Sequence, residues 1–370
     1  MTEDLINDLQ SFGARLVDPK AGAESRRGGA GPSDHKAITI DGMTVMAPVH
    51  NAPAFESPFL IDRPDARGVS RLLRDGAQVG EVSFPPRPKF YALATADGVP
   101  YWKIATLHGR DVLATTVLQT CIRYQSRTKT CQFCAIGQSL AAERTIERKT
   151  PAQLAEVAEA AVRLDGVRHM VMTTGTPRGP DRGAMILAES AVAVKAAVEL
   201  PIQVQCEPPD DDAWFERLKF AGADALGMHL EAVTESVRQR VMPAKASVDV
   251  ARYFSAFEAA VPVFGRGQVS TYILAGIGDA AGEILGVCER LVAIGVYPFV
   301  VPFIPIAGTP MESHPSPSPN FMASILGPLS RMLSDGGLRA VDVKAGCAKC
   351  GACSALSTYE RARALEGDLT

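Results

Sequence analysis

Three cysteines lie close together in the middle of the chain, Cys121, Cys131 and Cys134, in a sequence that has only 8 cysteines. Thiolates are the preferred ligands of iron–sulfur clusters, and clustered cysteines without secretory features indicate metal binding rather than disulfides. Three ligands on a four-iron cluster leave one iron open to bind a small molecule. The pattern predicts an open [4Fe-4S] cluster. A zinc knuckle, which usually needs four ligands in short paired spacings, and three unrelated thiols are the alternatives.

The segment between these cysteines is basic, because it contains Arg123, Arg127 and Lys129. A cluster held by three thiolates carries net negative charge, and nearby cations favour ionised thiols. The charge pattern therefore agrees with the metal-binding interpretation.

A second group of cysteines, Cys347, Cys350 and Cys353, lies near the end of the sequence, with glycines and a lysine among them. This spacing lets one tight loop present three thiolates, and it predicts a second iron–sulfur cluster. The fourth ligand would be Cys206, Cys288 or a substrate. A zinc site and a redox-labile tail are the alternatives.

The composition is that of a globular protein of 370 residues, with 46% hydrophobic and 21% charged residues. The net charge of −3 implies no polyanionic partner, so a nucleic-acid substrate is not expected. We find no apolar run long enough to cross a membrane and no signal peptide, so we expect a cytoplasmic protein. We expect three regions: an N-terminal extension over 1–110, a main domain over 111–340 and a Cys-rich tail over 341–370.

Residues 1–110 predict a small β-rich module behind one amphipathic helix from Asp4 to Leu16. The segment from Arg26 to Pro32 could cradle an anion or be a surface loop. The alternation from Ala37 to Val49, with Asp41 and Gly42 at its centre, predicts a hairpin. Further strands are expected over 79–84, 90–95 and 102–105.

From Asp111 onward, apolar strands alternate with helical patterns in six successive units. One helix start is explicit, because Thr150 as N-cap, Pro151 as first helical residue and Gln153 form a capping box. Six right-handed units predict an α/β fold with a partial (β/α)6 TIM-like barrel. Chemistry in such barrels sits at the carboxyl ends of the strands, and polar residues and glycines recur there. These ends contain Cys121, Thr174, Gly175, Cys206, Glu207, Glu231, Gly276, Gly278 and Pro305.

With these cysteines after the first strand, the chain resembles the radical S-adenosylmethionine (SAM) superfamily, in its biotin-synthase-like branch. Cys131 to Cys134, with Phe133 between them, is similar to the family's Cys-x-aromatic-Cys ending. The usual spacing is Cys-x3-Cys-x2-Cys, whereas here nine residues separate Cys121 from Cys131. The resemblance implies that SAM is held by Phe133, Thr173, Thr174, Gly175, Glu231, Gly276, Gly278 and Pro305, although the second strand lacks the family's glutamate.

The resemblance implies an enzyme that reductively cleaves SAM at the cluster of Cys121, Cys131 and Cys134. The resulting 5′-deoxyadenosyl radical would abstract hydrogen from a small-molecule substrate, with flavodoxin or ferredoxin as the electron donor. Together with the Arg26–Pro32 segment and the tail, the chain is also similar to a bacterial subgroup encoded beside a nitrilase and an acetyltransferase.

Substrate-side residues are less defined. Cys206 and Glu207 are candidates, although a cysteine there is also typical of a buried core position. Arg238, Arg240 and Lys245 follow the fourth strand and are interpreted as a solvated helix face, with contact to an anionic substrate as the alternative. A non-catalytic iron–sulfur or zinc protein, acting as scaffold, sensor or electron carrier, is the alternative function, and RNA modification by the same chemistry is a third.

Overall fold

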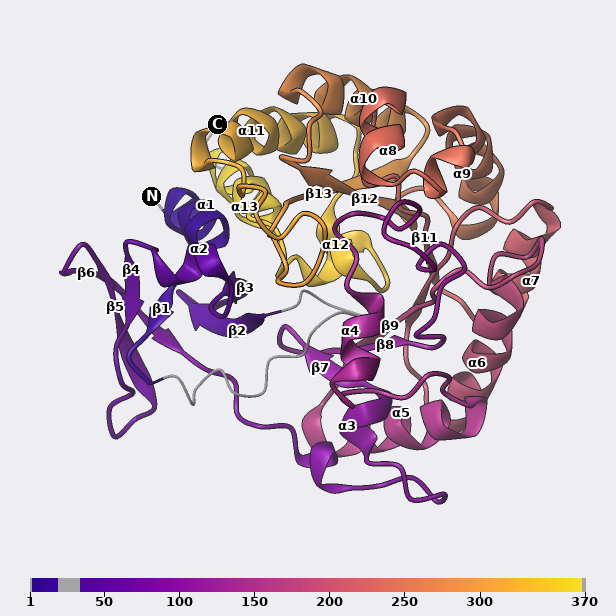
Figure 1. Cartoon of the computed structure of the whole chain (residues 1–370), viewed down its shortest axis with the longest axis horizontal. Coiled ribbons are helices and arrows are strands. Elements are labelled where there is room, and N and C mark those ends of the chain that lie inside the picture. Colours follow the sequence, from indigo (N-terminus) through magenta and orange to yellow (C-terminus); the bar gives the residue numbers. More distant parts are fainter. Residues whose placement is uncertain (1, 19–33, 368–370) are drawn as a thin grey trace.

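The computed structural model describes residues 2–18 and 34–367. The Arg26–Pro32 segment lies outside the described residues. Two sheets organise the chain, one of six strands and one of seven (Figure 1). Within the described ranges, no helix has both the length and the apolar character needed to cross a membrane.

The six-stranded sheet is the expected β-rich N-terminal module and has the strand order β1-β4-β5-β6-β2-β3. Asp41 and Gly42, both at positive φ, form the turn of the β2–β3 hairpin, as predicted. The first helix is shorter than predicted, because Gly13 at φ +69 ends it and Leu16 belongs to a strand. The elements are α1 (Thr2–Phe12), β1 (Arg15–Leu16), β2 (His35–Ile40), β3 (Met43–Pro48), α2 (Ala52–Phe55), β4 (Phe59–Ile61), β5 (Val69–Arg74) and β6 (Ala77–Ser83).

Two of the expected strands are wrong. The residues at 90–95 contain most of the 3-10 turn η2 (Lys89–Ala92), and those at 102–105 contain most of the short helix α3 (Tyr101–Ile104). A proline precedes each turn, Pro88 and Pro100, with φ of −58° and −54°. Proline fixes φ near the helical value and so favours the start of a helical turn, which outweighs the β propensity of these short apolar runs.

The seven-stranded sheet is the expected partial barrel. Its order is β13-β12-β11-β10-β9-β8-β7, and β8 to β13 are parallel, whereas β7 is an antiparallel edge strand. The strands are β7 (Thr106–His108), β8 (Val112–Thr116), β9 (His169–Thr173), β10 (Ile202–Gln205), β11 (Ala225–Gly227), β12 (Val269–Ala275) and β13 (Val296–Pro302).

Helices follow the parallel strands and cover the outer face of the curved sheet (Figure 1). The capping box of Thr150 and Gln153 is confirmed, and Pro151 is the first residue of α5. The helices are α4 (Ile136–Ala141), α5 (Pro151–Asp165), α6 (Ala184–Ala197), α7 (Ala213–Phe220), α8 (Glu235–Val241), α9 (Val250–Phe264), α10 (Ala281–Ala293), α11 (Pro319–Asp335), α12 (Cys347–Cys350) and α13 (Leu356–Gly367), with 3-10 turns η3 (Lys245–Ser247) and η4 (Ala340–Asp342).

The C-terminal segment turns back into the concave side of the barrel, where α12 lies within the curve of the sheet (Figure 1). The Ser354 hydroxyl donates to the Val300 carbonyl of β13 at 2.6 Å. The Ala352 carbonyl accepts from the Met46 amide of β3 at 2.7 Å and from the Gln10 side chain of α1 at 3.0 Å. The tail thus joins the N-terminal sheet to the interior of the barrel.

Candidate active site

The carboxyl ends of the six parallel strands converge on one side of the barrel. The loop that carries Cys121, Cys131 and Cys134 runs from the end of β8 to α4. Thr173 ends β9, and Thr174 and Gly175 follow it; Cys206 and Glu207 follow β10 directly. Glu231 follows β11, Gly276 and Gly278 follow β12, and Pro305 follows β13. The strand topology therefore brings the predicted site residues to one edge of the sheet.

The first part of the thiol loop is tied to the end of β9. The Gly175 amide donates to the Leu118 carbonyl at 2.9 Å, and the Ile122 amide donates to the Thr176 carbonyl at 2.9 Å. Only glycine fits at 175, because an added Cβ would lie 2.1 Å from the Thr120 carbonyl oxygen. The absence of a side chain thus lets the backbone beside Cys121 approach the end of β9 closely.

The second part of the loop is held by the end of α8 and by the loop that follows β13. The Gln132 amide donates to the Val241 carbonyl at the end of α8 at 2.7 Å, and the Gln132 carbonyl accepts from the Met311 amide at 3.2 Å. Cys131 and Phe133 pack against a small apolar cluster that includes Phe303. This packing surrounds one side of the thiol loop with hydrophobic side chains.

The three thiols share one electrostatic environment. Burial, together with the neighbouring Cys121 and Glu231, raises the pKa of Cys134 to about 12. Burial also raises the pKa of Cys131, while Lys245 opposes the shift. Through residues 2–18 and 34–367, no three His, Cys, Asp or Glu side chains converge as a single metal ion requires. A four-iron cluster instead spreads three thiolates over three irons, so the donor set of one loop fits a cluster by its chemistry.

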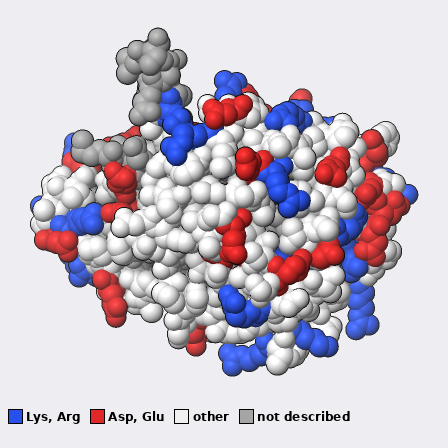
Figure 2. Space-filling view, turned by 90° about the horizontal axis from the view of Figure 1, so that it is seen from above, with Lys and Arg blue, Asp and Glu red and all other residues white. Residues whose placement is uncertain are grey.

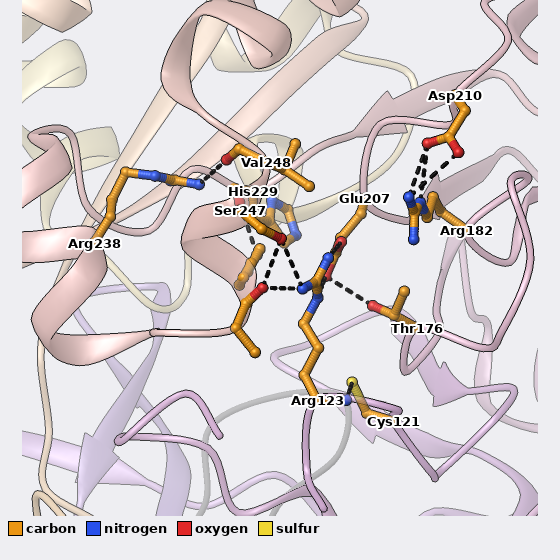
Figure 3. Close-up of polar contacts among 12 residues, drawn as sticks. Cys121, Arg123, Thr176, Arg182, Glu207, Asp210, His229, Arg238, Ser247 and Val248 are labelled. Carbon is orange, nitrogen blue, oxygen red and sulfur yellow. Dashed lines mark hydrogen bonds and ion pairs between the residues drawn. The ribbon is translucent and has the colours of Figure 1, made fainter. Parts of the chain in front are cut away.

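A buried ion pair fixes the residue two positions after Cys121 (Figure 3). Arg123 Nε donates to Glu207 Oε1 at 2.8 Å, and its Nη2 donates to Oε2 at 2.7 Å. Arg123 also donates to the Ala244 carbonyl, and Thr176 donates to Glu207 at 2.8 Å. Burial favours the neutral carboxyl, but the hydrogen bonds from Arg123 and Thr176 and the positive charges of Lys245 and Arg123 together outweigh it and hold the pKa of Glu207 below its usual value. The sequence singled out Arg123 and Glu207 separately, without indicating that they pair.

The interpretation of Arg238 and Lys245 as a solvated face is wrong, since both are buried. Arg238 donates to the Leu230 carbonyl at 2.7 Å and to the Val248 carbonyl at 2.7 Å, and its guanidinium lies over the Tyr253 ring. Backbone carbonyls after β11 needed a donor, which the helical charge pattern alone could not reveal. Arg240 is exposed, as expected.

Lys245 holds the candidate SAM ligand Glu231. Lys245 Nζ donates to Glu231 Oε2 at 2.7 Å and to the His229 carbonyl at 2.9 Å. Glu231 has a φ of +64°, which is strained for a residue with a side chain and is typical of functional positions. An isolated bridge to Ile273 of β12 helps to impose this conformation. The carboxylate is thereby fixed beside the thiol loop.

The loop after β12 also requires glycine. Gly276 has a φ of +100° and lies against Pro317, and Gly278 has a φ of +134° and lies against Arg240. Asp279 accepts hydrogen bonds from the Val233 and Thr234 amides, so the loops after β11 and β12 are joined. Pro305 is buried beyond β13. These contacts shape the part of the rim where the resemblance places SAM.

Cys206 packs into the main hydrophobic core, where burial raises the pKa of its thiol to about 12. Glu207, the other substrate-side candidate, is engaged by Arg123 as described above. Thr173 and Thr174 are partly exposed at the end of β9, and the Thr174 hydroxyl donates to the Gly175 carbonyl at 2.8 Å.

A pocket opens between the thiol loop and the tail. Phe133 and Phe303 line it on the side of the thiol loop, and Tyr272 and Cys353 line it on the side of the tail. The N-terminal module contributes Gln10, His35 and Met46 to its wall. A six-unit barrel leaves a lateral opening that the N-terminal module could be expected to cap, but no local pattern in residues 1–110 indicated which residues would line the pocket.

The three tail cysteines are partly accessible and lie inside the barrel. The Gly346 amide donates to His169 Nδ1 of β9 at 3.2 Å, and the Gln205 side chain of β10 donates to Cys347 Sγ at 3.4 Å. Cys353 Sγ lies 3.4 Å from His108 Nε2 of β7. The tail is therefore anchored by three strands of the barrel sheet, β7, β9 and β10.

The sequence of the barrel is similar to that of a known protein family. Residues 128–291 match the sequence model of the radical SAM superfamily. The chain carries a radical SAM domain. The matched segment includes Cys131, Cys134 and Glu231 and begins seven positions after Cys121.

Individual relatives are more distant. A stretch of 126 residues is 31% identical to the bacteriochlorophyllide c C-7(1)-hydroxylase of Chlorobaculum limnaeum, covering 34% of this chain and 31% of that enzyme. The chain thus spans less than a third of that relative's length. Methylornithine synthase has a TM-score of 0.48 at 17% identity, covering 67% of this chain and 68% of that one. A radical SAM methyltransferase from Sphaerobacter thermophilus has a TM-score of 0.45 at 16% identity, covering 76% and 75%.

Proposed function

We propose that this protein is a radical SAM enzyme that acts on a small molecule. The observation that carries the proposal is the thiol loop of Cys121, Cys131 and Cys134, which lies among the carboxyl ends of a partial barrel whose sequence matches the superfamily. When bound, a [4Fe-4S] cluster with an open iron supplies the electron that splits SAM into methionine and a 5′-deoxyadenosyl radical.

The other roles, which are binding the cluster, binding SAM and excluding water, belong to different residues of the chain. Cys121, Cys131 and Cys134 hold the cluster, and the Arg123–Glu207 pair fixes the loop that presents Cys121. Glu231, the Thr173–Gly175 strand end, Phe133, Gly276, Gly278 and Pro305 hold SAM. Phe303 and its apolar neighbours exclude water, which protects a reactive radical from side reactions. Cys206 packs in the core rather than at the pocket, so it has a structural role.

The pocket between Phe133 and Cys353 is the site for the substrate. Its lining is mostly apolar, with Gln10, His35 and Tyr272 as polar groups, which suits a small molecule of mixed character. On the face drawn in Figure 2, acidic and basic side chains are interspersed without a continuous basic patch, as a small-molecule enzyme would allow. Flavodoxin or ferredoxin would deliver the electron, in the cytoplasm.

Cys347, Cys350 and Cys353 hold a second iron–sulfur cluster in this proposal. Their place inside the barrel, beside the pocket, argues against a loose tail.

The test is anaerobic reconstitution with iron and sulfide, followed by addition of SAM and dithionite. We expect 5′-deoxyadenosine from the native chain and none from Cys121→Ala. Cys288→Ala is the matched control, because Cys288 is buried in α10 away from the strand ends. Stoichiometric zinc without SAM binding would support the alternative of a non-catalytic metal protein.

A further inference from the structure

A histidine from the edge strand of the barrel meets the tail cysteines. Cys353 Sγ lies 3.4 Å from Nε2 of His108, the last residue of β7. Gly109, the next residue, has a φ of +61°, and an added Cβ there would lie 3.1 Å from Cys350 Sγ. The β7–β8 turn therefore packs directly on two of the three tail thiols.

The separation of Cys353 and His108 fits two ligands of one metal. In tetrahedral sites with a metal–sulfur distance of about 2.3 Å and a metal–nitrogen distance of about 2.0 Å, the two ligand atoms lie about 3.5 Å apart. Ligands on different irons of a four-iron cluster are much farther apart, because each iron takes one protein ligand. The observed separation, which also allows a thiol–imidazole hydrogen bond, therefore fits a metal that takes two protein ligands, as each iron of a two-iron cluster does.

The other two thiols are suited to the second iron. Cys347 and Cys350 begin and end the single turn α12, so they lie three residues apart on one helical face. A Cys-x2-Cys turn of this kind commonly chelates one metal. Gly346 precedes it at φ +114°, where an added Cβ would lie 2.2 Å from the Gln203 side chain, so the turn is seated closely on β10.

Polar groups already face the thiols. The Gln205 amide donates to Cys347 Sγ at 3.4 Å, and the Tyr272 hydroxyl hydrogen-bonds the Cys353 thiol. Hydrogen bonds of this kind stabilise the charge of cluster thiolates and tune the reduction potential. Cys353 and Tyr272 also line the pocket, so a cluster here would border the substrate.

We propose that His108, Cys347, Cys350 and Cys353 hold a two-iron cluster, in which His108 and Cys353 share one iron. This assignment rests on the tail cluster proposed above and names its fourth ligand, in place of Cys206 or Cys288. Both of those residues are buried in the hydrophobic core.

The test uses the full chain with Cys121→Ala, Cys131→Ala and Cys134→Ala, so that only the tail site can bind iron. After anaerobic reconstitution, we expect about two irons and two sulfides per chain. The dithionite-reduced protein should show strong hyperfine coupling to a histidine nitrogen in pulsed electron paramagnetic resonance, and the coupling should change with ¹⁵N-histidine. SAM cleavage plays no part in this readout, so the test of the two-iron cluster is independent of the test of the proposed function.

Two further variants assign the nitrogen. His108→Cys should keep two irons, because it supplies a thiolate, but should lose the nitrogen coupling and lower the reduction potential. His169→Gln is the matched control, because His169 lies in the same interior but bonds the Gly346 backbone; it should keep the coupling. Four irons per chain, bound zinc, no bound metal, or a two-iron cluster whose coupling survives His108→Cys would overturn the proposal.

Discussion

Arg123 and Glu207 form a two-pronged ion pair, with Nε to Oε1 at 2.8 Å and Nη2 to Oε2 at 2.7 Å, although 84 positions separate them in the sequence. Their side chains are only 10% and 7% exposed. The pair joins the loop of Cys121 to the end of β10, so it couples the position of a proposed cluster ligand to the barrel.

Arg123→Met should lower the free energy of unfolding by about 3–5 kcal/mol, because it leaves the Glu207 carboxylate buried without its cation. The double variant Arg123→Met with Glu207→Leu should lose less than the single variant. Urea unfolding of the metal-free protein measures both. Arg163→Met is the control, because it breaks an exposed pair on α5 and should cost about 0.3–0.5 kcal/mol. Equal losses for the buried and the exposed pair would contradict the assigned role.

Gly175→Ala should displace the thiol loop, since the added methyl group would lie 2.1 Å from the Thr120 carbonyl oxygen. We expect lower iron content after reconstitution and a loss of about 1–3 kcal/mol in unfolding free energy. Gly286→Ala in α10 is the control, because nothing lies within 4 Å of its added Cβ, and it should be neutral or stabilise by up to about 1 kcal/mol. Unchanged iron loading in Gly175→Ala would show that the close approach at Thr120 is dispensable.

Glu231→Gln should weaken SAM binding while leaving iron content unchanged. Hydrogen bonds to charged groups contribute about 1.5–3 kcal/mol, so we expect the Kd for SAM to rise by about tenfold to a hundredfold. Anaerobic equilibrium dialysis with labelled SAM measures this. Glu216→Gln, on the exposed face of α7, is the control. A Kd that stays the same in both variants would remove Glu231 from the proposed SAM site.

Gly346→Ala should loosen the tail from the barrel, because its φ is +114° and the new side chain would lie 2.2 Å from Gln203. We expect faster tryptic cleavage at Lys344 and Lys349 and lower iron in the tail site. Gly327→Ala within α11, whose added Cβ meets only Tyr359 at 4.0 Å, should leave the cleavage rate unchanged. Equal cleavage rates in the two variants would count against the close seating of α12.

Local chemistry made much of the fold predictable. Asp41 and Gly42 predicted the hairpin, and Thr150 with Gln153 predicted the start of α5, because turns and caps depend on neighbouring residues. The six strand–helix units then placed the polar strand ends together. The strand predictions at 90–95 and 102–105 were wrong, because a short apolar run can form either a strand or a helical turn. The proline before each run favoured the helical turn.

The parts that could not be predicted depend on contacts between distant segments. The cysteine spacing of the tail was visible in the sequence. Its contacts with the barrel were not, because Cys347 and Gln205 are 142 positions apart and Cys353 and His108 are 245 positions apart. The burial of Arg238 follows from backbone carbonyls after β11 that no charge pattern reports. The contribution of His35 and Met46 to the pocket likewise depends on how two sheets meet.

The central claim is reductive SAM cleavage at the thiol loop. The most direct measurement is 5′-deoxyadenosine released by the anaerobically reconstituted chain with SAM and dithionite, compared with Cys121→Ala, Cys131→Ala and Cys134→Ala. We predict product from the native chain and from Cys288→Ala, and none from the three variants. A native chain that loads with iron and binds SAM but yields no 5′-deoxyadenosine, or a Cys121→Ala chain that still yields it, would contradict the account.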